Sequence, residues 1–499
     1  MTKLINLMID YKYWGKMEEF LLELEKSLGK EKVAYNVLDM FPYSRDWSPM
    51  FFEKDYLPDA VCIPSSTEDV VKIVHVADRY EVPIVPWGGG TGMGGDNLAV
   101  KGGVVIATRS MSGILELDKK NRTLTVQAGA TIQSINDYLK PHGLWFPHDP
   151  ESKPTSTIGA AMMCDSDGTF GIKYGGMVDY LLNCVMVLPN GERVRLGQRK
   201  AASTSSGYKL MWLMIGSEGT LGIITEITIR VFPRPEERKV MLWLAKEMKD
   251  GIEALYRIHG SGIWLESAHI NDGHRLDYYT HAYKERTGKA AEIPKGFSSL
   301  LALTVAGDKD VVEFSVSKIS KMMEELGLKL FENEEIVKGW WASKHTLQWE
   351  KNKWSSSQRT AKFGAADVAV PPGRIEDIYK AYLRITKKYG IKRVGTAVYN
   401  SRPHVSPSIS FAVYVDDHDP KSVENFFRFV KDISKEALKM EGTMSSYIGD
   451  GIRLRQLTPL EHGDGLDMMW KIKESFDPKL IMNPGKIFPK RYDPTDYEV

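Results

Sequence analysis

The chain has 499 residues and a formal net charge of +1, so its charge gives no electrostatic case for nucleic-acid binding. Its length exceeds what one ordinary hydrophobic core holds, and we expect two or three domains. Its three cysteines, Cys62, Cys164 and Cys184, are scattered singly, which excludes a disulfide framework and a CxxC metal or iron–sulfur site.

No run of about 18 apolar residues is present to span a bilayer, and the first residues do not form a secretory signal. Together with the scattered cysteines, this predicts a cytoplasmic protein. Association with the periphery of a membrane stays open.

The first predicted elements form a helix and then a β-α-β unit. Residues 14–29 place Trp14, Phe20 and Leu24 on one helical face, and Gly29 marks the end of that helix. A proline-bounded strand over 58–64, a helix over 70–80 and a strand over 82–85 follow.

A glycine-rich stretch, residues 86–95, directly follows the second strand of this unit. Six of its last eight residues are glycine, which permits positive φ and leaves backbone N–H groups bare. Consecutive inward N–H groups form a concave anion site. The stretch matches neither a Rossmann nor a P-loop pattern. A flexible turn is the alternative, but its place between two apolar strands favours a phosphate-binding loop.

Further strands are predicted over 103–108, 113–118 and 123–128, with a helix over 130–142. The polar passage 146–152 contains His148, which could form a site wall, act as a base or serve as a structural hydrogen bonder; we favour the last. Residues 156–163 are small and allow close backbone approach. The turn Pro189-Asn190-Gly191 joins a hairpin, and a glycine-rich turn over 213–222 precedes a strand over 224–232. The proline-broken stretch 233–237 is taken as a domain boundary.

From residue 238 to about 437, predicted strands and helices alternate. The strands are 240–244, 264–270, 299–306, 329–332, 394–399 and 409–416, and the helices are 251–259, 311–326, 375–389 and 421–440. This order indicates a mixed sheet covered on one face. A tail helix is predicted over 465–474.

These segments together resemble the FAD-linked oxidase superfamily of the vanillyl-alcohol-oxidase type. The branch that the chain resembles is that of the D-lactate dehydrogenase and glycolate oxidase flavoprotein subunits, with alkyl-dihydroxyacetone-phosphate synthase as a cousin. The resemblance covers nearly the whole chain, and it rests on the order and spacing of segments 58–64, 86–95, 157–159, 171–179, 188–192, 216–223 and 483–486.

The resemblance implies an α+β fold in which a two-subdomain FAD-binding domain carries a mixed-sheet cap domain. We therefore expect an N-terminal helical segment over 1–39, an FAD-binding domain over 40–236, a cap over 237–440, and a C-terminal segment over 441–499 that returns to the FAD domain.

The resemblance also implies which residues contact FAD. Loop 86–95 would hold the pyrophosphate together with residues 166–171, segment 157–161 would pass near the isoalloxazine or ribityl, and segment 219–223 would lie near the adenosine. The full expected set is Pro86, Trp87, Gly88, Gly89, Gly90, Thr91, Gly92, Met93, Pro150, Thr157, Ile158, Gly159, Ala161, Asp165, Gly168, Gly171, Tyr174, Glu218, Gly222, Ile223, Ile224 and Asn483. Because the loop has no histidine, we expect non-covalent FAD, with attachment through the cap left open.

Oxidation of a 2-hydroxy acid requires a base for the hydroxyl proton and a cation for the carboxylate. Arg402 and His404 stand within three positions on a predicted loop and are the first candidates for the cation and the base. The alternative is a solvated loop with a surface histidine. Arg359 and Lys362 are weaker alternatives.

Tyr447 is a third catalytic candidate, since a phenol can donate to or accept from a substrate oxygen. An ordinary packed tyrosine is the alternative. Asp450 and Arg453 are expected to form a local charge pair. The tryptophans Trp340, Trp341, Trp349 and Trp354 could line an apolar pocket but more often indicate core.

No metal is expected. Metal-assisted relatives carry a Glu-His pair where this chain has Tyr447 and Ile448, and isoleucine cannot bind a metal. A literal Glu461-His462-Gly463 lies too near residue 483 to match and is interpreted as a helix-entry turn. The histidine cluster of the synthase branch is also missing.

The predicted function is therefore FAD-dependent oxidation of a 2-hydroxy acid, of the D-lactate or glycolate type, by hydride transfer to flavin. The alternatives are oxidation of a larger or phenolic alcohol, a non-redox reaction like that of the synthase, and a flavin subunit that works with an iron–sulfur partner. The expected partners are a small hydroxylated substrate, an unidentified electron acceptor, a redox partner protein and further copies of the same chain.

Overall fold

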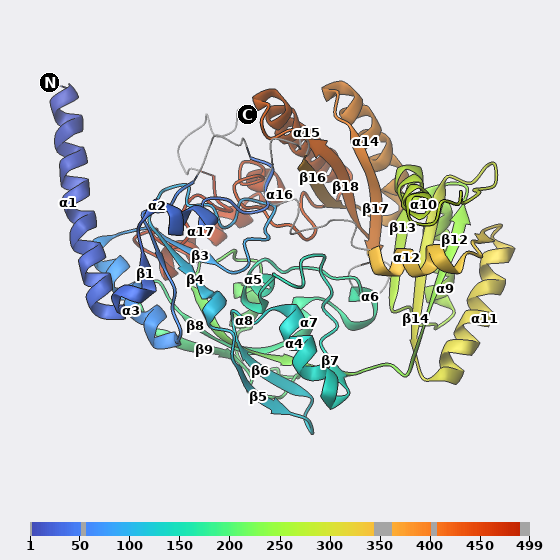
Figure 1. Ribbon diagram of the computed structural model, residues 1–499, viewed down its shortest axis with the longest axis horizontal. Helices are drawn as coiled ribbons and strands as arrows, with labels where there is room; N and C mark the ends of the chain where they lie inside the picture. Colours follow the sequence, from blue (N-terminus) through green and yellow to red (C-terminus); the bar gives the residue numbers. More distant parts are fainter. Residues whose placement is uncertain (1, 51–55, 344–361, 401–406, 490–499) are drawn as a thin grey trace.

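The computed structural model describes residues 2–50, 56–343, 362–400 and 407–489 (Figure 1). Helix α1 (Thr2–Leu28) ends at Gly29, whose φ of 93° suits glycine, as the sequence predicts. It begins earlier than predicted, and its first turns extend beyond the body of the molecule (Figure 1). Met17, Phe20 and Leu24 are buried in the core that also contains α3 (Thr67–Tyr80).

The first sheet positions the glycine-rich loop. Its strands are β1 (Val33–Ala34), β2 (Ala60–Cys62), β4 (Val104–Ala107) and β3 (Ile84–Trp87), in that order, and β2, β4 and β3 are parallel. The predicted β-α-β unit is therefore present as β2-α3-β3, with β4 placed between its two strands. The glycine-rich loop leaves the carboxyl end of β3, the edge at which ligands bind in open parallel sheets.

The second sheet is antiparallel, in the order β5 (Ile114–Asp118), β6 (Thr123–Gln127), β10 (Ile223–Arg230), β8 (Leu181–Val187), β9 (Arg193–Gly197). Helices α4 (Ile132–Leu139) and α5 (Ile158–Met163) contribute to its core. The predicted hairpin is β8 and β9. The short elements of this region are α2 (Val37–Met40), β7 (Leu144–Trp145), α6 (Gly171–Tyr174), α7 (Met177–Tyr180), α8 (Leu210–Met214) and β11 (Phe232–Pro233).

The cap is a seven-stranded sheet that differs from the mixed sheet we expected, because all its strand pairs are antiparallel. Its order is β15 (Lys329–Leu330), β12 (Glu237–Ala245), β14 (Ser299–Gly307), β13 (Ser267–Asn271), β17 (Arg393–Asn400), β18 (Pro407–Val415), β16 (Lys362–Ala369). The chain does make two parallel crossovers, β12-α9-β13 and β16-α14-β17. In each, a later strand inserts between the parallel pair, β14 in the first and β18 in the second.

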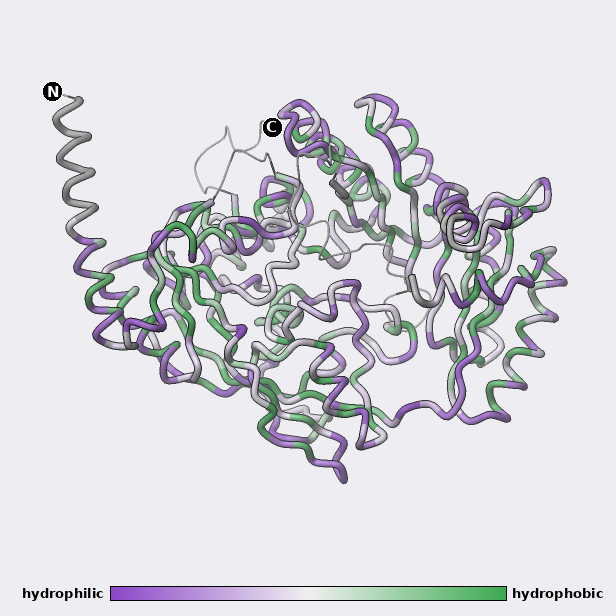
Figure 2. The backbone as a smooth tube through the Cα atoms, viewed as in Figure 1, coloured by the Kyte–Doolittle hydropathy of each residue, from purple (hydrophilic) through white to green (hydrophobic). Residues whose placement is uncertain are grey.

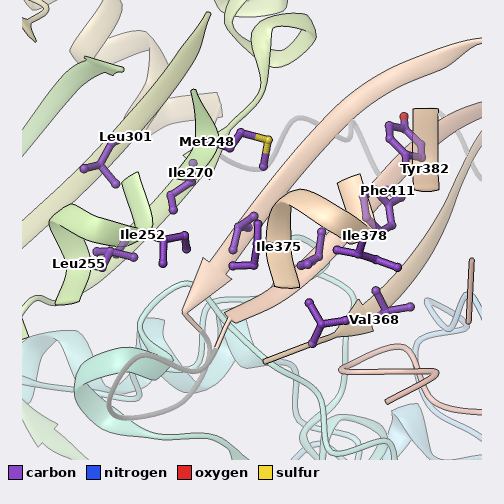
Figure 3. Packing of buried hydrophobic residues seen from close by; sticks show 14 of the residues in the cluster. Met248, Ile252, Leu255, Ile270, Leu301, Val368, Ile375, Ile378, Tyr382 and Phe411 are labelled. Carbon is purple, nitrogen blue, oxygen red and sulfur yellow. The ribbon is translucent and has the colours of Figure 1, made fainter. Parts of the chain in front are cut away.

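One face of the cap sheet carries the main core. Helices α9 (Met248–Gly260), α11 (Lys309–Glu325), α14 (Ile375–Tyr389) and α15 (Pro420–Lys439) cover it, and Figure 3 shows Ile252, Leu255, Ile270, Ile378 and Phe411 in this packing. Along the tube in Figure 2, strands are largely hydrophobic, whereas these helices alternate between hydrophobic and hydrophilic residues.

Two helices that the sequence analysis missed cover part of the other face. Helices α10 (Gly273–Thr287) and α12 (Glu334–Ser343) form a smaller core with β12 and β14. Helix α10 has few aliphatic residues, so it lacks the periodic pattern that predicts a helix.

The C-terminal segment returns to the first sheet (Figure 1). After α15 come α16 (Thr458–His462) and α17 (Gly465–Phe476), and then the chain runs beside β3. The amide of Ile84 donates to Ile481 O at 2.8 Å, and the amide of Asn483 donates to Ile84 O at 2.7 Å. Within the described ranges, none of the helices combines the length and apolar character needed to cross a bilayer.

Candidate active site

A deep cavity lies where the two N-terminal sheets meet the cap and the returning segment. Fifteen of the predicted cofactor residues and Tyr447 line it: Pro86, Trp87, Gly88, Gly90, Thr91, Gly92, Met93, Pro150, Gly159, Ala161, Gly168, Glu218, Gly222, Ile223 and Ile224. We call this space the flavin cavity.

The glycine-rich loop presents its amides to this cavity. Within the described ranges, no hydrogen bond is donated by a backbone amide of residues 88–95. The loop is held instead through its carbonyls, because Trp47 N donates to Gly92 O at 2.9 Å and Ile452 N donates to Gly94 O at 3.0 Å. A row of free N–H groups fits a diphosphate.

Close packing around α5 explains two glycines, Gly88 in the loop and Gly159 in the helix, which packs against Ala128. A Cβ at position 88 would lie 2.4 Å from Thr157 Oγ1, and a Cβ at position 159 would lie 2.8 Å from Ala128 Cβ. Thr157 also caps α5 by accepting from Ala160 N. Glycine is therefore required for the loop to approach the helix.

Seven predicted cofactor residues do not line the flavin cavity: Gly89, Thr157, Ile158, Asp165, Gly171, Tyr174 and Asn483. Several hold neighbouring segments instead. The hydroxyl of Tyr174 donates to Glu266 at 3.4 Å. Asn483 Nδ2 donates to Asp96 O at 3.0 Å and to Glu218 O at 2.7 Å, so this side chain joins the tail to the cavity wall.

Glu218 is a buried carboxylate in the cavity wall. It accepts hydrogen bonds from Asp450 N at 2.6 Å and from Gly451 N at 2.9 Å. Burial, reinforced by the charge of Asp96, raises the pKa of Glu218 well above its ordinary value. Its contacts join the glycine-rich turn before β10 to the C-terminal segment.

Asp96 follows the loop and was not singled out from the sequence. It lines the cavity and is 3% exposed, and neither carboxylate oxygen has a hydrogen-bond partner among the described residues. Burial, with the neighbouring charge of Asp46, raises the pKa of Asp96 to about 7 despite the nearby Lys486 and Arg453. The sequence signal for it is an acid placed directly after a predicted anion-binding loop.

The cap supplies the opposite wall of the cavity by strand alternation. On β18, Ile409 and Phe411 point into the main core, whereas Ser408 and Ser410 line the flavin cavity. His269 of β13, Ala365 of β16 and Tyr399 of β17 line it in the same way. Because side chains alternate between the two faces of a strand, these positions could have been predicted once the core-facing residues were known.

Among the described residues, Arg275 supplies a cation to this wall. It lies in the first turn of α10, is 2% exposed and lines the cavity. Asp272 caps the helix and accepts from Arg275 N at 3.1 Å. Burial disfavours the guanidinium charge, but Tyr399, Tyr279 and the carboxylates of Glu151 and Asp272 outweigh burial and raise the pKa of Arg275. Arg275 was not among the predicted site residues because α10 was not predicted.

Tyr447 and Ile448 lie on a turn organised by Asp367. One Asp367 oxygen accepts from the amides of Ser446, Tyr447 and Ile448 at 2.8–2.9 Å, and the other accepts from Arg453 at 2.8 Å. Arg453 therefore pairs with Asp367 and not with Asp450 as we expected. Burial and the charge of Asp367 raise the pKa of Tyr447 well above its ordinary value.

The other predicted residues divide between packing and undescribed segments. Arg402, His404, Arg359, Trp349 and Trp354 lie outside the described residues. His148 is buried and lies 3.3 Å from Ser166 Oγ, which agrees with a structural hydrogen bonder. Trp340 is buried in the smaller core.

Glu461 accepts from Thr443 Oγ1 and from Met444 N. With His462 it ends α16, and Gly463 follows in the turn that leads into α17, so this segment does precede the predicted helix.

Comparison with known proteins assigns the two parts of the chain. The family described as "FAD binding domain" matches residues 58–197, and "FAD linked oxidases, C-terminal domain" matches residues 234–487. Glycolate oxidase subunit GlcD of Bacillus subtilis is 30% identical over 460 residues, covering 90% of this chain and 92% of its own. D-lactate dehydrogenase [cytochrome] 1 of Saccharomyces cerevisiae is 30% identical over 448 residues, covering 88% of this chain and 73% of its own.

Solved structures share the fold at lower identity. An alkyldihydroxyacetonephosphate synthase has a TM-score of 0.73 at 21% identity, covering 93% of this chain and 85% of its own. The 4-ethylphenol oxidase of Gulosibacter chungangensis has a TM-score of 0.75 at 17% identity, covering 96% of this chain and 98% of its own. With its glycine-rich loop free to hold a diphosphate and its cap closing the cavity, the chain belongs to the FAD-linked oxidase family and is an FAD-dependent oxidoreductase that acts on a small molecule.

Proposed function

We propose that the protein oxidises the hydroxyl group of a 2-hydroxy acid of the D-lactate or glycolate type. The observation that carries this proposal is Arg275, a buried cation in the cap wall of the flavin cavity. A guanidinium in a cavity wall can donate two parallel hydrogen bonds to the two oxygens of a substrate carboxylate. The names of the related D-lactate dehydrogenases and glycolate oxidases support the same substrate class.

FAD, when bound, supplies the two-electron acceptor for this oxidation. Residues 88–93 would hold its diphosphate through their free amides. On the cap side, Arg275 would hold the carboxylate. Tyr399 and Tyr447 lie in the same wall, and their raised pKa values keep both as phenols at neutral pH, able to donate a hydrogen bond to a substrate oxygen.

The hydroxyl proton needs a base other than a neutral phenol. His404 remains the predicted base, with Arg402 as a second predicted carboxylate ligand. Among the described residues, His269 places another imidazole in the cavity wall, beside Tyr399 with ring centroids 4.8 Å apart. The variants His404→Asn and His269→Asn show which histidine is the base. The variant that lacks the base should lose the increase of kcat/KM with rising pH.

The proposal is tested by anaerobic mixing of the purified protein with D-lactate, glycolate and phenolic alcohols while flavin absorption is followed. We expect a 2-hydroxy acid to bleach the flavin. Arg275→Gln should raise KM for the acid by roughly tenfold to a hundredfold, as expected for a charged hydrogen bond. Arg374→Gln, an exposed arginine of the cap, is the matched control.

Bleaching by a phenolic alcohol alone would overturn the proposal in favour of the second substrate class. An unchanged KM in Arg275→Gln with a raised KM in Arg402→Ala would move the carboxylate site to the undescribed loop.

We further propose that FAD is held non-covalently, and acid precipitation should release all of it into the supernatant. All three cysteines are free thiols, two of them buried, which supports a reducing cytoplasm. The electron acceptor, a redox partner protein and assembly with further copies of the chain are proposals that size analysis and copurification would test.

A further inference from the structure

A second cavity, of about 590 Å³, lies against the returning segment, and none of the described residues lines both it and the flavin cavity. Its wall combines the chain after the glycine-rich loop, helix α15 and the C-terminal segment. We call it the tail cavity. It is lined by Met50, Tyr56, Val100, Lys101, Thr220, Phe427, Lys431, Ile452, Arg453, Arg455, Gln456, Leu457, Trp470, Lys473, Leu480, Asn483, Pro484, Gly485, Lys486, Phe488 and Pro489.

The tail cavity is positively charged. Among the described lining residues, six are Lys or Arg and none is Asp or Glu. Some of this charge is used internally, because Lys473 pairs with Asp477 and Lys486 Nζ donates to Leu98 O at 2.7 Å. Arg453 likewise pairs with Asp367. Lys101 and Arg455 form no ion pair with a described carboxylate, so these two charges remain for a ligand.

Two arginines in this wall each have an unused donor at a buried Nε atom. Arg453 Nε and Arg455 Nε are buried and lack a hydrogen-bond partner among the described residues. Other nitrogens of these groups do have partners: Arg453 donates to Ala365 O and Asp367, and Arg455 Nη1 donates to Gly485 O at 2.9 Å. The side chain of Arg453 is 2% exposed. Buried donors of this kind are normally satisfied, and an acceptor on a ligand would satisfy them.

The rest of the wall is apolar and aromatic. Trp470 and Phe488 pack with ring centroids 4.5 Å apart, and Phe427, Met50 and Leu480 complete the surface. We propose that the tail cavity binds an organic anion that carries an aromatic or other apolar body, in addition to the substrate of the flavin cavity. The anionic group would contact Arg455 and Lys101, and the apolar body would lie against Trp470. The volume is that of a small-molecule site.

The test uses the FAD-loaded protein and two matched probes, naphthalene-1-sulfonate and the uncharged naphthalene-1-sulfonamide. Isothermal titration should give measurable binding of the sulfonate, at least roughly tenfold tighter than the sulfonamide. Arg455→Gln and Lys101→Gln should each weaken sulfonate binding, Arg455→Gln by roughly tenfold or more. The control is Lys439→Gln, an exposed lysine at the end of α15 that does not line the cavity, and it should leave sulfonate binding unchanged.

The exposed Lys101 keeps the test valid if Arg455→Gln fails to fold. Arg275→Gln separates this proposal from the proposed function, because it alters the flavin cavity and should leave sulfonate binding unchanged. Equal affinity for both probes, binding that Arg275→Gln abolishes, or binding by the apoprotein that FAD removes would each overturn the proposal.

Discussion

Asp96 places a buried carboxylate directly beneath a loop built to hold a diphosphate. Its pKa in the folded protein is about 7, against about 4 for an unfolded aspartate. Between these values the folded state keeps a proton that the unfolded state has released. The contribution of Asp96 to the free energy of unfolding therefore falls as pH rises from about 4 to about 7.

We predict that Asp96→Asn removes this dependence. Relative to the parent protein, the variant should gain ~1–3 kcal/mol of unfolding free energy between pH 5 and pH 8. Urea unfolding of the apoprotein at both pH values measures the change. Asp310→Asn, an exposed position on α11, serves as the control. Parallel stability curves for Asp96→Asn and the parent would contradict the assignment.

Asp367 is the second residue on which the site depends. It is the buried partner of Arg453 and the acceptor for the turn that carries Tyr447. We predict that Asp367→Asn costs ~3–5 kcal/mol, since it leaves a buried guanidinium unpaired. Chemical denaturation measures the loss.

A double variant tests this reasoning. Combining Asp367→Asn with Arg453→Met should recover part of the loss, because the uncompensated charge is gone. Strictly additive losses would show that the pair does not act as one unit.

At the scale of elements, the approach of the glycine-rich loop to α5 sets the shape of the FAD site. We predict that Gly88→Ala lowers FAD affinity by roughly tenfold or more, because a Cβ would overlap Thr157 Oγ1 and displace the loop. Fluorescence titration of the apoprotein with FAD measures the effect. Gly373→Ala is the matched control, since a Cβ there meets no atom within 4 Å. An unchanged FAD affinity in Gly88→Ala would exclude the close-packing argument.

Helix α10 positions Arg275 through its cap. We predict that Asp272→Ala, which removes the acceptor for Arg275 N, costs ~1–2 kcal/mol and raises KM for the hydroxy acid more than it lowers kcat. Asp272→Asn keeps a capping oxygen and should largely restore both values. If the two variants have the same KM, the cap does not position the arginine.

At the scale of the whole molecule, contacts distant in sequence hold the two walls of the flavin cavity together. Trp47 bonds to the glycine-rich loop and packs against Ala365 and Ile448 on the cap side. Arg238, at the start of the cap sheet, pairs with the buried Glu266 and lies over the ring of Trp145 at 5.3 Å. These contacts place the cap relative to the flavin side.

Asn483 connects the tail to the same site. We predict that Asn483→Ala costs ~2–3 kcal/mol and weakens FAD binding, because the carbonyls of Asp96 and Glu218 lose their buried donor. Lys479→Ala, in the same segment, breaks a half-exposed pair with Asp78 and should cost at most ~1 kcal/mol. Thermal unfolding with and without FAD measures both. Equal effects of the two variants would contradict a specific role for Asn483.

Local chemistry in the sequence was sufficient for most elements and for the cofactor. Short-range patterns predicted three kinds of element. The glycines at positions 88 and 90 predicted the loop, and alternating residues predicted the cap strand β18. Amphipathic periodicity predicted helix α14 with the bounds that the structure has. The order of motifs then indicated FAD, and comparison with the family confirms it.

Only the tertiary structure decided the substrate wall. Strand β14 lies between β12 and β13, and β18 lies between β16 and β17. Both placements depend on pairing between strands distant in sequence, so local sequence patterns could not predict an antiparallel cap sheet. Helix α10 has no aliphatic stripe, so its local sequence does not predict a helix. Arg275, in its first turn, was therefore not predicted as a site residue. Residues 269 and 275 lie far in sequence from residues 399 and 447, and only the packing of the chain brings all four to one cavity wall. The sequence by itself thus determined the cofactor and its loop, whereas chain packing decided which side chains face the substrate.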